Sequence, residues 1–176
     1  KREVLEKDFF KKPLGFRACK TNSHIIDQYI VELYSILKTK VQRLSEQIIV
    51  CAVGGYGRRH LAPYSDVDLL FLHNSKLNSE ILEEIIKFIL YPIWDLGLNV
   101  GHAVRSENES SQLIKKDHII KTSMLDARLV CGSKSFFNKF ISNYKKNVSE
   151  QARIFFKEKV TDRNKRLLNL NSDFFR

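Results

Sequence analysis

Apolar residues in the first third of the chain recur every three or four positions, which predicts an amphipathic helix over about 25–48. Thr21 to Ser23 offer an N-cap for this helix, so we expect an irregular segment before them. The β-branched, apolar run Ile48–Val53 lacks polar alternation, which is typical of a strand buried on both faces, and Gly54 with Gly55 ends it. The pattern therefore predicts a helix followed by a buried strand.

The middle of the chain continues this alternation of strand and helix. Val67–Leu72 predicts a second strand and Leu98–Val104 a third. Between them, Asn78 or Ser79 is expected to cap a helix that ends near Asp95–Gly97. The remainder of the chain shows almost only helical periodicity. Its main helices are predicted over 119–129, 136–144 and 152–168.

The pattern as a whole predicts an α+β fold, in which a small mixed sheet is flanked by helices and followed by a helical extension. There is no internal repeat, low-complexity tract or Pro/Ser-rich linker. The length of 176 residues suits one compact core, since single domains usually hold about 100 to 200 residues. We expect an irregular lead-in over 1–22, a sheet-containing domain over 23–132 and a helical extension over 133–176.

The composition is that of a globular protein. Apolar residues make up 43% of the chain and charged residues 28%, which argues against disorder. No apolar run reaches the roughly 18 residues of a bilayer span, and the first residues lack the apolar stretch of a signal peptide. Cys19, Cys51 and Cys131 are odd in number and widely spaced, so we expect reduced core residues. We expect a cytoplasmic protein that does not bind a membrane.

The formal net charge of +10 could indicate a polyanionic partner. Many lysines, however, are spread over the predicted helices among Asn, Ile and Phe, and no ladder of aromatic and basic residues accompanies them. We therefore do not expect a nucleic-acid partner, and we keep DNA or RNA binding by the basic helical tail as the weakest alternative.

Gly54 and Gly55 stand directly after the predicted buried strand. Because they have no side chains, their backbone N–H groups can approach an anion closely. The turn that follows can begin a helix whose positive end faces that anion. We expect this turn to hold a triphosphate.

Asp66 and Asp68 are separated by one residue at the start of the second strand, so their side chains should point to the same face. Two carboxylates on one face repel each other unless a cation lies between them. Mg²⁺ is the expected cation, because it binds carboxylates together with phosphate oxygens. With two ions, one would lower the pKa of an attacking hydroxyl and the other would neutralise a leaving pyrophosphate. Ser65 could donate a hydrogen bond to a phosphate oxygen.

Each motif alone has a plainer interpretation. A single Gly-Gly is usually a tight turn, and a single Asp-x-Asp is more often a solvated turn than a catalytic site. In this chain they occur about eleven residues apart, with Gly-Gly closing one strand and Asp-x-Asp opening the next. A turn does not require this strand–loop–strand arrangement, so we favour a phosphate and metal site.

The extended motif formed by Gly54–Arg58 and Leu61–Leu70 resembles a known signature. It is similar to that of DNA polymerase β-like nucleotidyltransferases, in the form found in bacterial protein-PII uridylyltransferases. Two further blocks, Tyr91–Arg105 and Ser123–Leu129, also resemble that family. The resemblance covers most of the sheet-containing domain and implies a nucleotidyltransferase-type sheet.

The resemblance implies an enzyme that transfers UMP from UTP to a tyrosine hydroxyl of the nitrogen-signalling protein PII and releases pyrophosphate. It implies that Gly54 and Gly55 hold the triphosphate, and that Asp66 and Asp68 are catalytic and hold Mg²⁺. We add three candidate nucleotide-binding residues, which are Arg58, Ser65 and Arg105. In that family an HD phosphohydrolase domain and ACT domains follow; we find neither, and we expect the chain to be an N-terminal catalytic piece of a longer protein.

Some positions depart from the family pattern. Arg59 and His60 stand where Gly and Glu are usual, which could change the conformation of the loop. The wider superfamily often has a third metal-binding carboxylate on a later strand, but 98–104 contains none, and His102 lies in the corresponding place. Three other carboxylates could contribute, and their spacing does not select one: Asp95, Glu107 and Asp126.

Arginine suits bidentate phosphate contacts, so Arg105 at the end of the third strand could pair with the triphosphate, or it could be a surface residue beside a strand-end His102. Asp126 and Arg128 are expected on a helix, as a structural ion pair or as solvated charges.

Three functional hypotheses remain beside nucleic-acid binding. The first is an active protein uridylyltransferase, which the block Trp94–Arg105 favours. The second is a nucleotidyltransferase with another base or acceptor, such as an adenylyltransferase of a different protein. The third is a non-catalytic nucleotide-binding regulatory module, which the missing third carboxylate and the altered Arg59 and His60 motivate.

Overall fold

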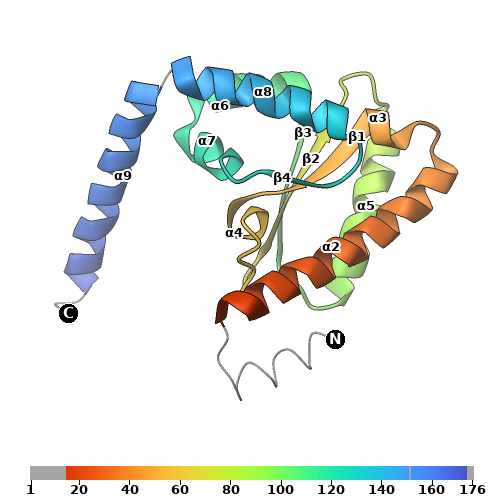
Figure 1. Ribbon diagram of the computed structural model, residues 1–176, viewed down its shortest axis with the longest axis horizontal. Helices are drawn as coiled ribbons and strands as arrows, with labels where there is room; N and C mark the ends of the chain where they lie inside the picture. Colours follow the sequence, from red (N-terminus) through yellow and green to blue (C-terminus); the bar gives the residue numbers. More distant parts are fainter. Residues whose placement is uncertain (1–14, 151, 174–176) are drawn as a thin grey trace.

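The computed structural model describes residues 15–150 and 152–173, without the side chains of 115, 116, 118, 166 and 169–173. Figure 1 shows a sheet with helices packed around it and a last helix that extends away from the body of the molecule. The helices are α2 (Gly15–Lys40), α3 (Leu44–Gln47), α4 (Gly54–Gly57), α5 (Ser79–Asp95), α6 (Glu107–Lys116), α7 (His118–Met124), α8 (Lys134–Glu150) and α9 (Ala152–Asp173). The strands are β1 (Ile48–Ala52), β2 (Val67–His73), β3 (Val100–Ser106) and β4 (Arg128–Cys131).

The four strands form one mixed sheet in the order β3-β2-β1-β4. β1 is antiparallel to β2 on one side and to β4 on the other, and all of its residues are buried, as its apolar sequence predicts. β2 is parallel to β3, and in this register Asp68 is paired with Gly101. The predicted α+β class with a small mixed sheet is confirmed.

Two layers of helices cover opposite faces of the sheet. α2 and α5 cover one face, and α6, α7 and α8 cover the other. We call these the α2/α5 face and the α6–α8 face. Residues of β2 alternate between them, so Leu69 and Phe71 pack on the α2/α5 face and Leu70 and Leu72 on the α6–α8 face. Asp68, two positions before Leu70, therefore lies on the α6–α8 face.

The first described helix begins earlier than predicted. α2 covers Gly15–Lys40, so Thr21 and Ser23 lie inside it and the predicted N-cap is wrong. Their hydroxyls donate to carbonyl oxygens four residues earlier, at 3.0 and 2.8 Å, and do not cap a helix. Ser23 also accepts a hydrogen bond from the Leu61 N–H at 3.3 Å, so it holds the loop after α4. The earlier part of the predicted lead-in, 1–14, lies outside the described residues.

The elements in the middle of the chain follow the prediction closely. The side chain of Asn78 accepts hydrogen bonds from the N–H groups of Glu80 and Ile81, so the predicted cap is confirmed. Gly97 adopts φ +70° just beyond the end of α5, as glycines at helix C-termini commonly do. β3 begins two residues later than predicted and ends at Ser106, which forms a capping box at the start of α6.

The region after β3 is not entirely helical. α7 ends at Met124, and Arg128–Cys131 forms β4 at one edge of the sheet. A short apolar run cannot be assigned to helix or strand from its periodicity alone, and here pairing with the buried β1 decides it. The predicted helix through 129 is wrong for this segment, and Arg128 belongs to the sheet.

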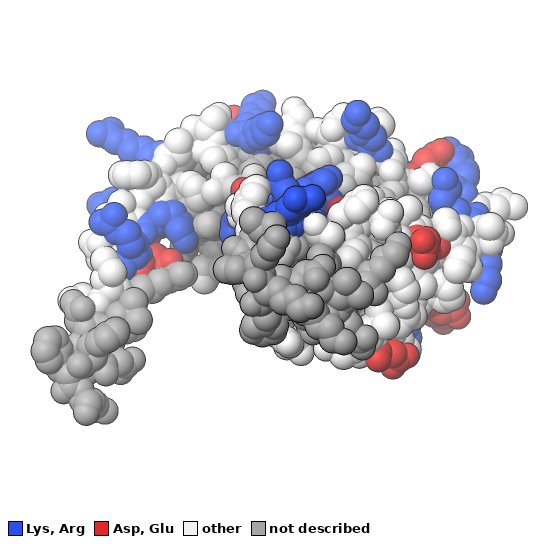
Figure 2. Space-filling model, turned by 60° about the horizontal axis from the view of Figure 1, so that its bottom comes forward, with Lys and Arg blue, Asp and Glu red and all other residues white. Residues whose placement is uncertain are grey.

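Figure 2 shows one face of the molecule, on which Lys and Arg lie in separate groups without one continuous stripe. Cys51 and Cys131 are buried, Cys19 is partly buried, and all three are free thiols. None of the helices in the described part of the chain combines the length and apolarity that crossing a bilayer requires.

Gly132, which follows β4, provides a test of the fold. It adopts φ +107°, and an added Cβ would lie 2.6 Å from Ile49 Cγ2 and 2.9 Å from Ile49 Cα. Gly97 also has a positive φ, but no atom of the described residues lies within 4 Å of an added Cβ. We predict that Gly97→Ala costs about 1–2 kcal/mol of unfolding free energy from backbone strain. Gly132→Ala should cost a further ~1–3 kcal/mol because it adds a clash. Urea unfolding of both variants measures the difference, and equal losses would contradict this packing.

Candidate active site

Asp66 and Asp68 lie where β2 begins, at the same end of the sheet as the C-terminus of β1. The N–H of Val53, the first residue after β1, donates to the Asp68 carbonyl at 3.1 Å. The two central strands are therefore tied together at the point where the glycine turn leaves the sheet. The predicted strand–loop–strand arrangement brings Gly54 to Asp68.

Two glycines make room for the Asp68 carboxylate. A Cβ on Gly54, which has φ +57°, would lie 3.0 Å from Asp68 Oδ2. A Cβ on Gly101, the β3 residue paired with Asp68, would lie 2.6 Å from Oδ1. A side chain at Gly101 would force the carboxylate to move, and one at Gly54 would crowd it in a strained backbone conformation. The carboxylate thus occupies a slot lined by backbone on two sides.

The electrostatics of the pair favour a bound cation. Burial, followed by the nearby charge of Asp66, raises the pKa of Asp68 above its ordinary value of 3.8. Within the described part of the chain, no hydrogen bond or ion pair reaches either carboxylate. Two adjacent carboxylates without a counter-charge are the oxygen ligands that a hard divalent cation takes, so the residues present fit such an ion.

α4 begins directly after β1 and leads toward the loop before β2. The N–H groups of Gly57 and Arg58 donate to the carbonyls of Val53 and Gly54, at 2.9 and 3.3 Å. The first N–H groups of a helix have no partner inside it, and in α4 they lie at the end where Gly54 approaches Asp68. An anion at this end would meet N–H donors on one side and a carboxylate-bound cation on the other.

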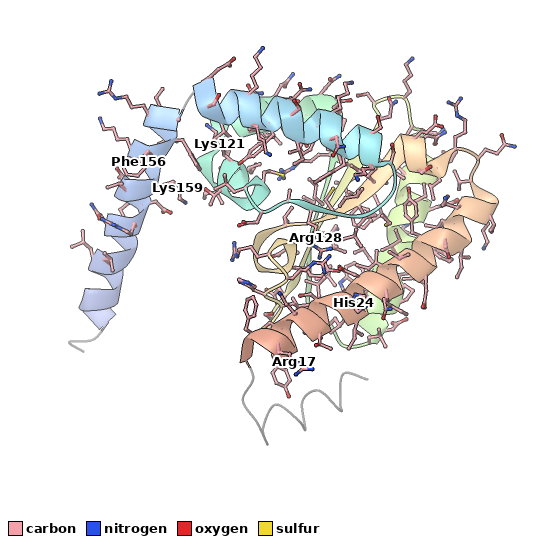
Figure 3. All side chains as sticks on the ribbon, in the orientation of Figure 1. Arg17, His24, Lys121, Arg128, Phe156 and Lys159 are labelled. Atoms are coloured by element: carbon pink, nitrogen blue, oxygen red, sulfur yellow. The ribbon has the colours of Figure 1, made fainter. Side chains whose placement is uncertain are left out.

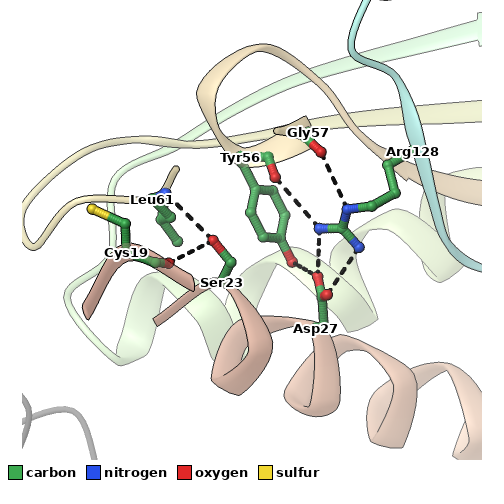
Figure 4. Close-up of polar contacts among 7 residues, drawn as sticks. All are labelled: Cys19, Ser23, Asp27, Tyr56, Gly57, Leu61 and Arg128. Carbon is green, nitrogen blue, oxygen red and sulfur yellow. Dashed lines mark hydrogen bonds and ion pairs between the residues drawn. The ribbon is translucent and has the colours of Figure 1, made fainter. Parts of the chain in front are cut away.

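The opposite end of α4 is held by a buried polar network, shown in Figure 4. The hydroxyl of the fully buried Tyr56 donates to Asp27 Oδ1 at 2.7 Å. Arg128 forms a two-point ion pair with the Asp27 carboxylate at 2.8 and 2.9 Å. It also donates to the carbonyls of Gly57 at 3.3 Å and Tyr56 at 3.4 Å. Burial and the charge of Asp27 raise the pKa of Tyr56, so its hydroxyl remains a proton donor.

This network joins three segments that are far apart in sequence. Asp27 lies on α2, Tyr56 on α4 and Arg128 on β4, and Figure 3 shows Arg128 between β4 and α2. The sequence prediction missed Asp27 and Tyr56, and it placed Arg128 on a helix. Tyr56 stands inside the Gly-rich motif, which was the one available signal for it.

Arg58 and Asp126 form an ion pair at 2.6 Å, with 48% and 34% of their side chains exposed. A Cβ on Gly57 would lie 2.2 Å from the Asp126 carbonyl oxygen, so the backbone of Asp126 packs directly against α4. Asp126 and Arg128 do not pair with each other and do not lie on a helix. Asp126 pairs with Arg58, and Arg128 pairs with Asp27. A nucleotide contact by Arg58 stays a prediction, and it would require this partly exposed pair to open.

The other two predicted nucleotide-binding residues differ in their distance from the carboxylates. Ser65 adjoins Asp66, and its exposed hydroxyl donates to the Ala62 carbonyl at 2.8 Å. Arg105 is paired with Leu72, four residues beyond Asp68, which corresponds to about 13 Å along the strand. The structure therefore brings Ser65 next to the pair and leaves Arg105 farther along the same face.

His102 does not lie beside Asp68 on the α6–α8 face. It is paired with Leu69, whose side chain packs on the α2/α5 face, and its ring contacts Trp94 with 6.0 Å between centroids. The expectation that His102 occupies the place of a third carboxylate is wrong, because a paired residue shares the face of its partner. Gly101 holds that place next to Asp68.

The described residues contain no group of three or more His, Cys, Asp or Glu side chains that could hold a metal. Of the three carboxylates considered from the sequence, Glu107 follows the far end of β3 and pairs with Lys139 at 3.0 Å. Asp95 ends α5. Asp126 is the one that contacts the glycine turn, through Gly57.

A family model for the nucleotidyltransferase domain matches residues 34–161, a range that contains the glycine turn, the carboxylate pair and all four strands. The chain belongs to the nucleotidyltransferase family. It is an enzyme of the nucleotidyltransferase type, as the extended Gly-Gly to Asp-x-Asp motif predicts.

Three curated relatives of this nucleotidyltransferase are named bifunctional uridylyltransferase/uridylyl-removing enzyme. The Rhodospirillum rubrum protein is 37% identical over 81% of this chain and 16% of the relative. The Caulobacter vibrioides protein is 42% identical over 67% of this chain and 13% of the relative. The Azospirillum brasilense protein is 32% identical over 95% of this chain and 18% of the relative. The chain thus spans less than a fifth of the length of these relatives. A crystal structure of a toxin-antitoxin with AMP-PNP is 15% identical, with a TM-score of 0.42 over 74% of this chain and 96% of that chain.

Arg59 and His60 are the positions where the resemblance leads us to expect Gly and Glu. Arg59 adopts φ +62°, in the left-handed region that favours glycine, so a glycine would be less strained at this position. The His60 ring packs edge-on against Phe16 of α2, with 5.0 Å between centroids. The loop therefore has a glycine-like backbone at Arg59 and a contact to α2 through His60.

The raised pKa of Asp68 makes the stability of this nucleotidyltransferase depend on pH. Between 3.8 and the raised folded-state pKa, the folded chain holds more protons at Asp68 than the unfolded chain does. The contribution of Asp68 to the unfolding free energy therefore falls as pH rises through this window. We predict that Asp68→Asn removes this fall, and that Mg²⁺ stabilises the wild type above the window but not the variant.

Urea unfolding of both proteins at several pH values, with and without Mg²⁺, measures these effects. A stability difference between wild type and Asp68→Asn that does not change with pH would contradict the assignment.

Proposed function

We propose that this nucleotidyltransferase transfers UMP from UTP to a tyrosine hydroxyl of the PII signalling protein, with Mg²⁺ as the metal. The observation that carries the proposal is the Asp66 and Asp68 pair beside the start of α4, which has no partner among the described residues and in which two glycines border the Asp68 carboxylate. The names of the curated relatives support the choice of uridylyl transfer over other nucleotidyl transfers.

The proposed roles follow from the placement of the residues. The N–H groups of Gly54 and Gly55 bind the triphosphate, Asp66 and Asp68 hold Mg²⁺, and Ser65 donates to a phosphate oxygen. When bound, Mg²⁺ lowers the pKa of the attacking hydroxyl and offsets negative charge on the leaving group. Arg58 and Arg105 remain proposed nucleotide contacts, the first after release of Asp126 and the second toward the outer end of the triphosphate.

The proposed reaction balances without a further reactant. The tyrosine oxygen forms a bond to the α-phosphorus of UTP, and the bond between the α-phosphorus and the bridging oxygen to the β-phosphate breaks. Pyrophosphate leaves, and the phenolic proton passes to solvent. The attacking oxygen and the leaving pyrophosphate must lie on opposite sides of the α-phosphorus. This arrangement requires that the glycine turn fixes the triphosphate while the carboxylates face the α-phosphate.

A second candidate is a regulatory module that binds nucleotide without turnover. Its supporting observation is that the described residues hold two carboxylates at the site and no third one. This candidate has the same binding site, so only a transfer assay separates it from the first.

The direct test is incubation of the chain with PII, Mg²⁺ and radiolabelled UTP or ATP. We expect label on PII from UTP, in excess of label from ATP. Asp68→Asn should reduce labelling to background, since a neutral amide of nearly the same size weakens the metal site. Glu84→Gln, an exposed carboxylate on α5, serves as the matched control and should label like the wild type.

The outcomes separate the hypotheses. Labelling that persists in Asp68→Asn would refute the metal assignment. Label from ATP instead of UTP would favour another nucleotidyl transfer, and UTP binding without any label would favour the regulatory module.

A second test concerns the glycine turn. Among the described residues, the one atom within 4 Å of an added Cβ at Gly55 is the His60 carbonyl oxygen, at 3.8 Å, which is an ordinary contact. We therefore predict that Gly55→Val changes the unfolding free energy by only about 1 kcal/mol but abolishes measurable UTP binding, because its branched side chain intrudes on the phosphate path. Calorimetry with UTP and Mg²⁺ measures affinity, and Gly15→Val is the control, because no atom of the described residues lies within 4 Å of an added Cβ there. Unchanged UTP affinity in Gly55→Val would count against the turn as the triphosphate site.

A further inference from the structure

The glycine turn has little structure of its own with which to hold its shape. α4 has four residues, three of them glycine, and Tyr56 is the only one with a side chain. An isolated helical turn of this length is not stable in water, and glycine weakens it further. The orientation of its N–H groups must therefore be set by contacts from other segments.

Arg128 supplies such contacts at the C-terminal end of the turn. Its guanidinium donates to the carbonyls of Tyr56 and Gly57, the end of a helix that carries partial negative charge. The same group forms the two-point ion pair with Asp27, and the Tyr56 hydroxyl donates to that carboxylate. Arg128 thus holds the backbone of α4 directly, and it holds the Tyr56 side chain through their shared partner Asp27.

The register places this support behind the turn. Arg128 is paired with Ala52, the last residue of β1, and Ala52 packs in the cluster on the α2/α5 face. Asp68 lies on the α6–α8 face, where it approaches Gly54 at the other end of the turn. The N–H and C=O groups of a helical turn point in opposite directions along its axis. Because Arg128 holds the α4 carbonyls at the end near Asp27, the α4 N–H groups are directed toward the end near Asp68.

We infer that Arg128, together with Asp27, is a positioning residue for the nucleotide: it sets the orientation of the triphosphate-binding N–H groups without touching the triphosphate. The inference rests on the proposed function of the turn. Burial makes the pair sensitive to change, since only 20% of the Arg128 side chain and 13% of the Asp27 side chain are exposed.

Arginine is required because four hydrogen bonds leave its planar group in fixed directions. Lysine keeps the charge but has a single nitrogen, which cannot reach both oxygens of Asp27 and two carbonyls at once. Arg128→Lys should therefore preserve the charge balance of the pair and loosen the turn. Tyr56→Phe makes a smaller change, because it removes the hydroxyl bond to Asp27 and leaves the ring in place.

The experiment measures UTP binding by calorimetry with Mg²⁺, at a temperature where every variant is folded by circular dichroism. Arg128→Lys should weaken UTP binding by about ten- to a hundredfold, the range that a misplacement of roughly 1 Å produces. Tyr56→Phe should weaken it less. The control is Tyr34→Phe, which removes a buried hydroxyl bond to the Ile48 carbonyl, at the opposite end of β1, and should bind like the wild type.

A purely structural role would lower the unfolding temperature of Arg128→Lys and Tyr34→Phe alike and leave UTP affinity unchanged in the folded proteins. That result would overturn the inference while the proposed function stands. If Arg128→Lys does not fold, Tyr56→Phe decides: wild-type affinity in that variant overturns the inference, and weaker affinity supports it. Absence of UTP binding in the wild type would overturn the proposed function and the inference with it.

Discussion

The close approach of Asp68 to two glycines is the constraint on which the site depends. Its carboxylate lies where a Cβ on Gly54 or on Gly101 would stand 3.0 or 2.6 Å away. Parallel pairing of β2 with β3 brings Gly101 there, and the turn after β1 brings Gly54. The fold therefore keeps two sides of the carboxylate free of side chains, and burial, followed by the nearby charge of Asp66, makes its ionised form costly and raises the Asp68 pKa. A cation removes that cost, which links the packing of the sheet to the chemistry of the site.

The turn that faces this carboxylate is supported from behind. Tyr56 and Arg128 fix α4 against Asp27 of α2, and the Asp126 backbone packs against Gly57. These supports come from α2 and from the segment that begins β4, so segments far apart in the chain converge on the four residues of α4. Catalytic chemistry in such a site is mostly positioning and charge compensation, and it needs a rigid frame more than many reactive groups.

Much of this fold follows from the sequence because the decisive signals are local. The apolar β1 run, the Asn78 cap and the Gly-Gly and Asp-x-Asp motifs each depend on a few neighbouring residues. The buried strand, the cap and the strand–loop–strand arrangement of the two motifs are confirmed. The start of α2 was mispredicted because Thr and Ser can bond backward to the helix as well as cap it.

What the sequence could not reveal depends on pairing across the sheet. β4 is a strand because it meets β1, and neither its length nor its periodicity requires this. His102 faces away from Asp68 because of the register between β2 and β3, and this register cannot be predicted from the residue types alone. The Asp27–Tyr56–Arg128 network joins residues 29 to 101 positions apart, so sequence spacing held no sign of it. The roles of the predicted site residues stay predictions, although the structure brings Gly54, Ser65, Asp66 and Asp68 to one end of the sheet.

We propose that this end of the sheet binds a metal and a nucleotide together. A crystal structure with Mn²⁺ and a non-hydrolysable UTP analogue tests it most directly, because anomalous scattering locates the metal independently of the nucleotide. We expect a metal peak between the Asp66 and Asp68 carboxylates, with triphosphate oxygens on that ion and on the N–H groups of Gly54 and Gly55. Metal bound elsewhere, or a triphosphate that does not contact the turn, would contradict it.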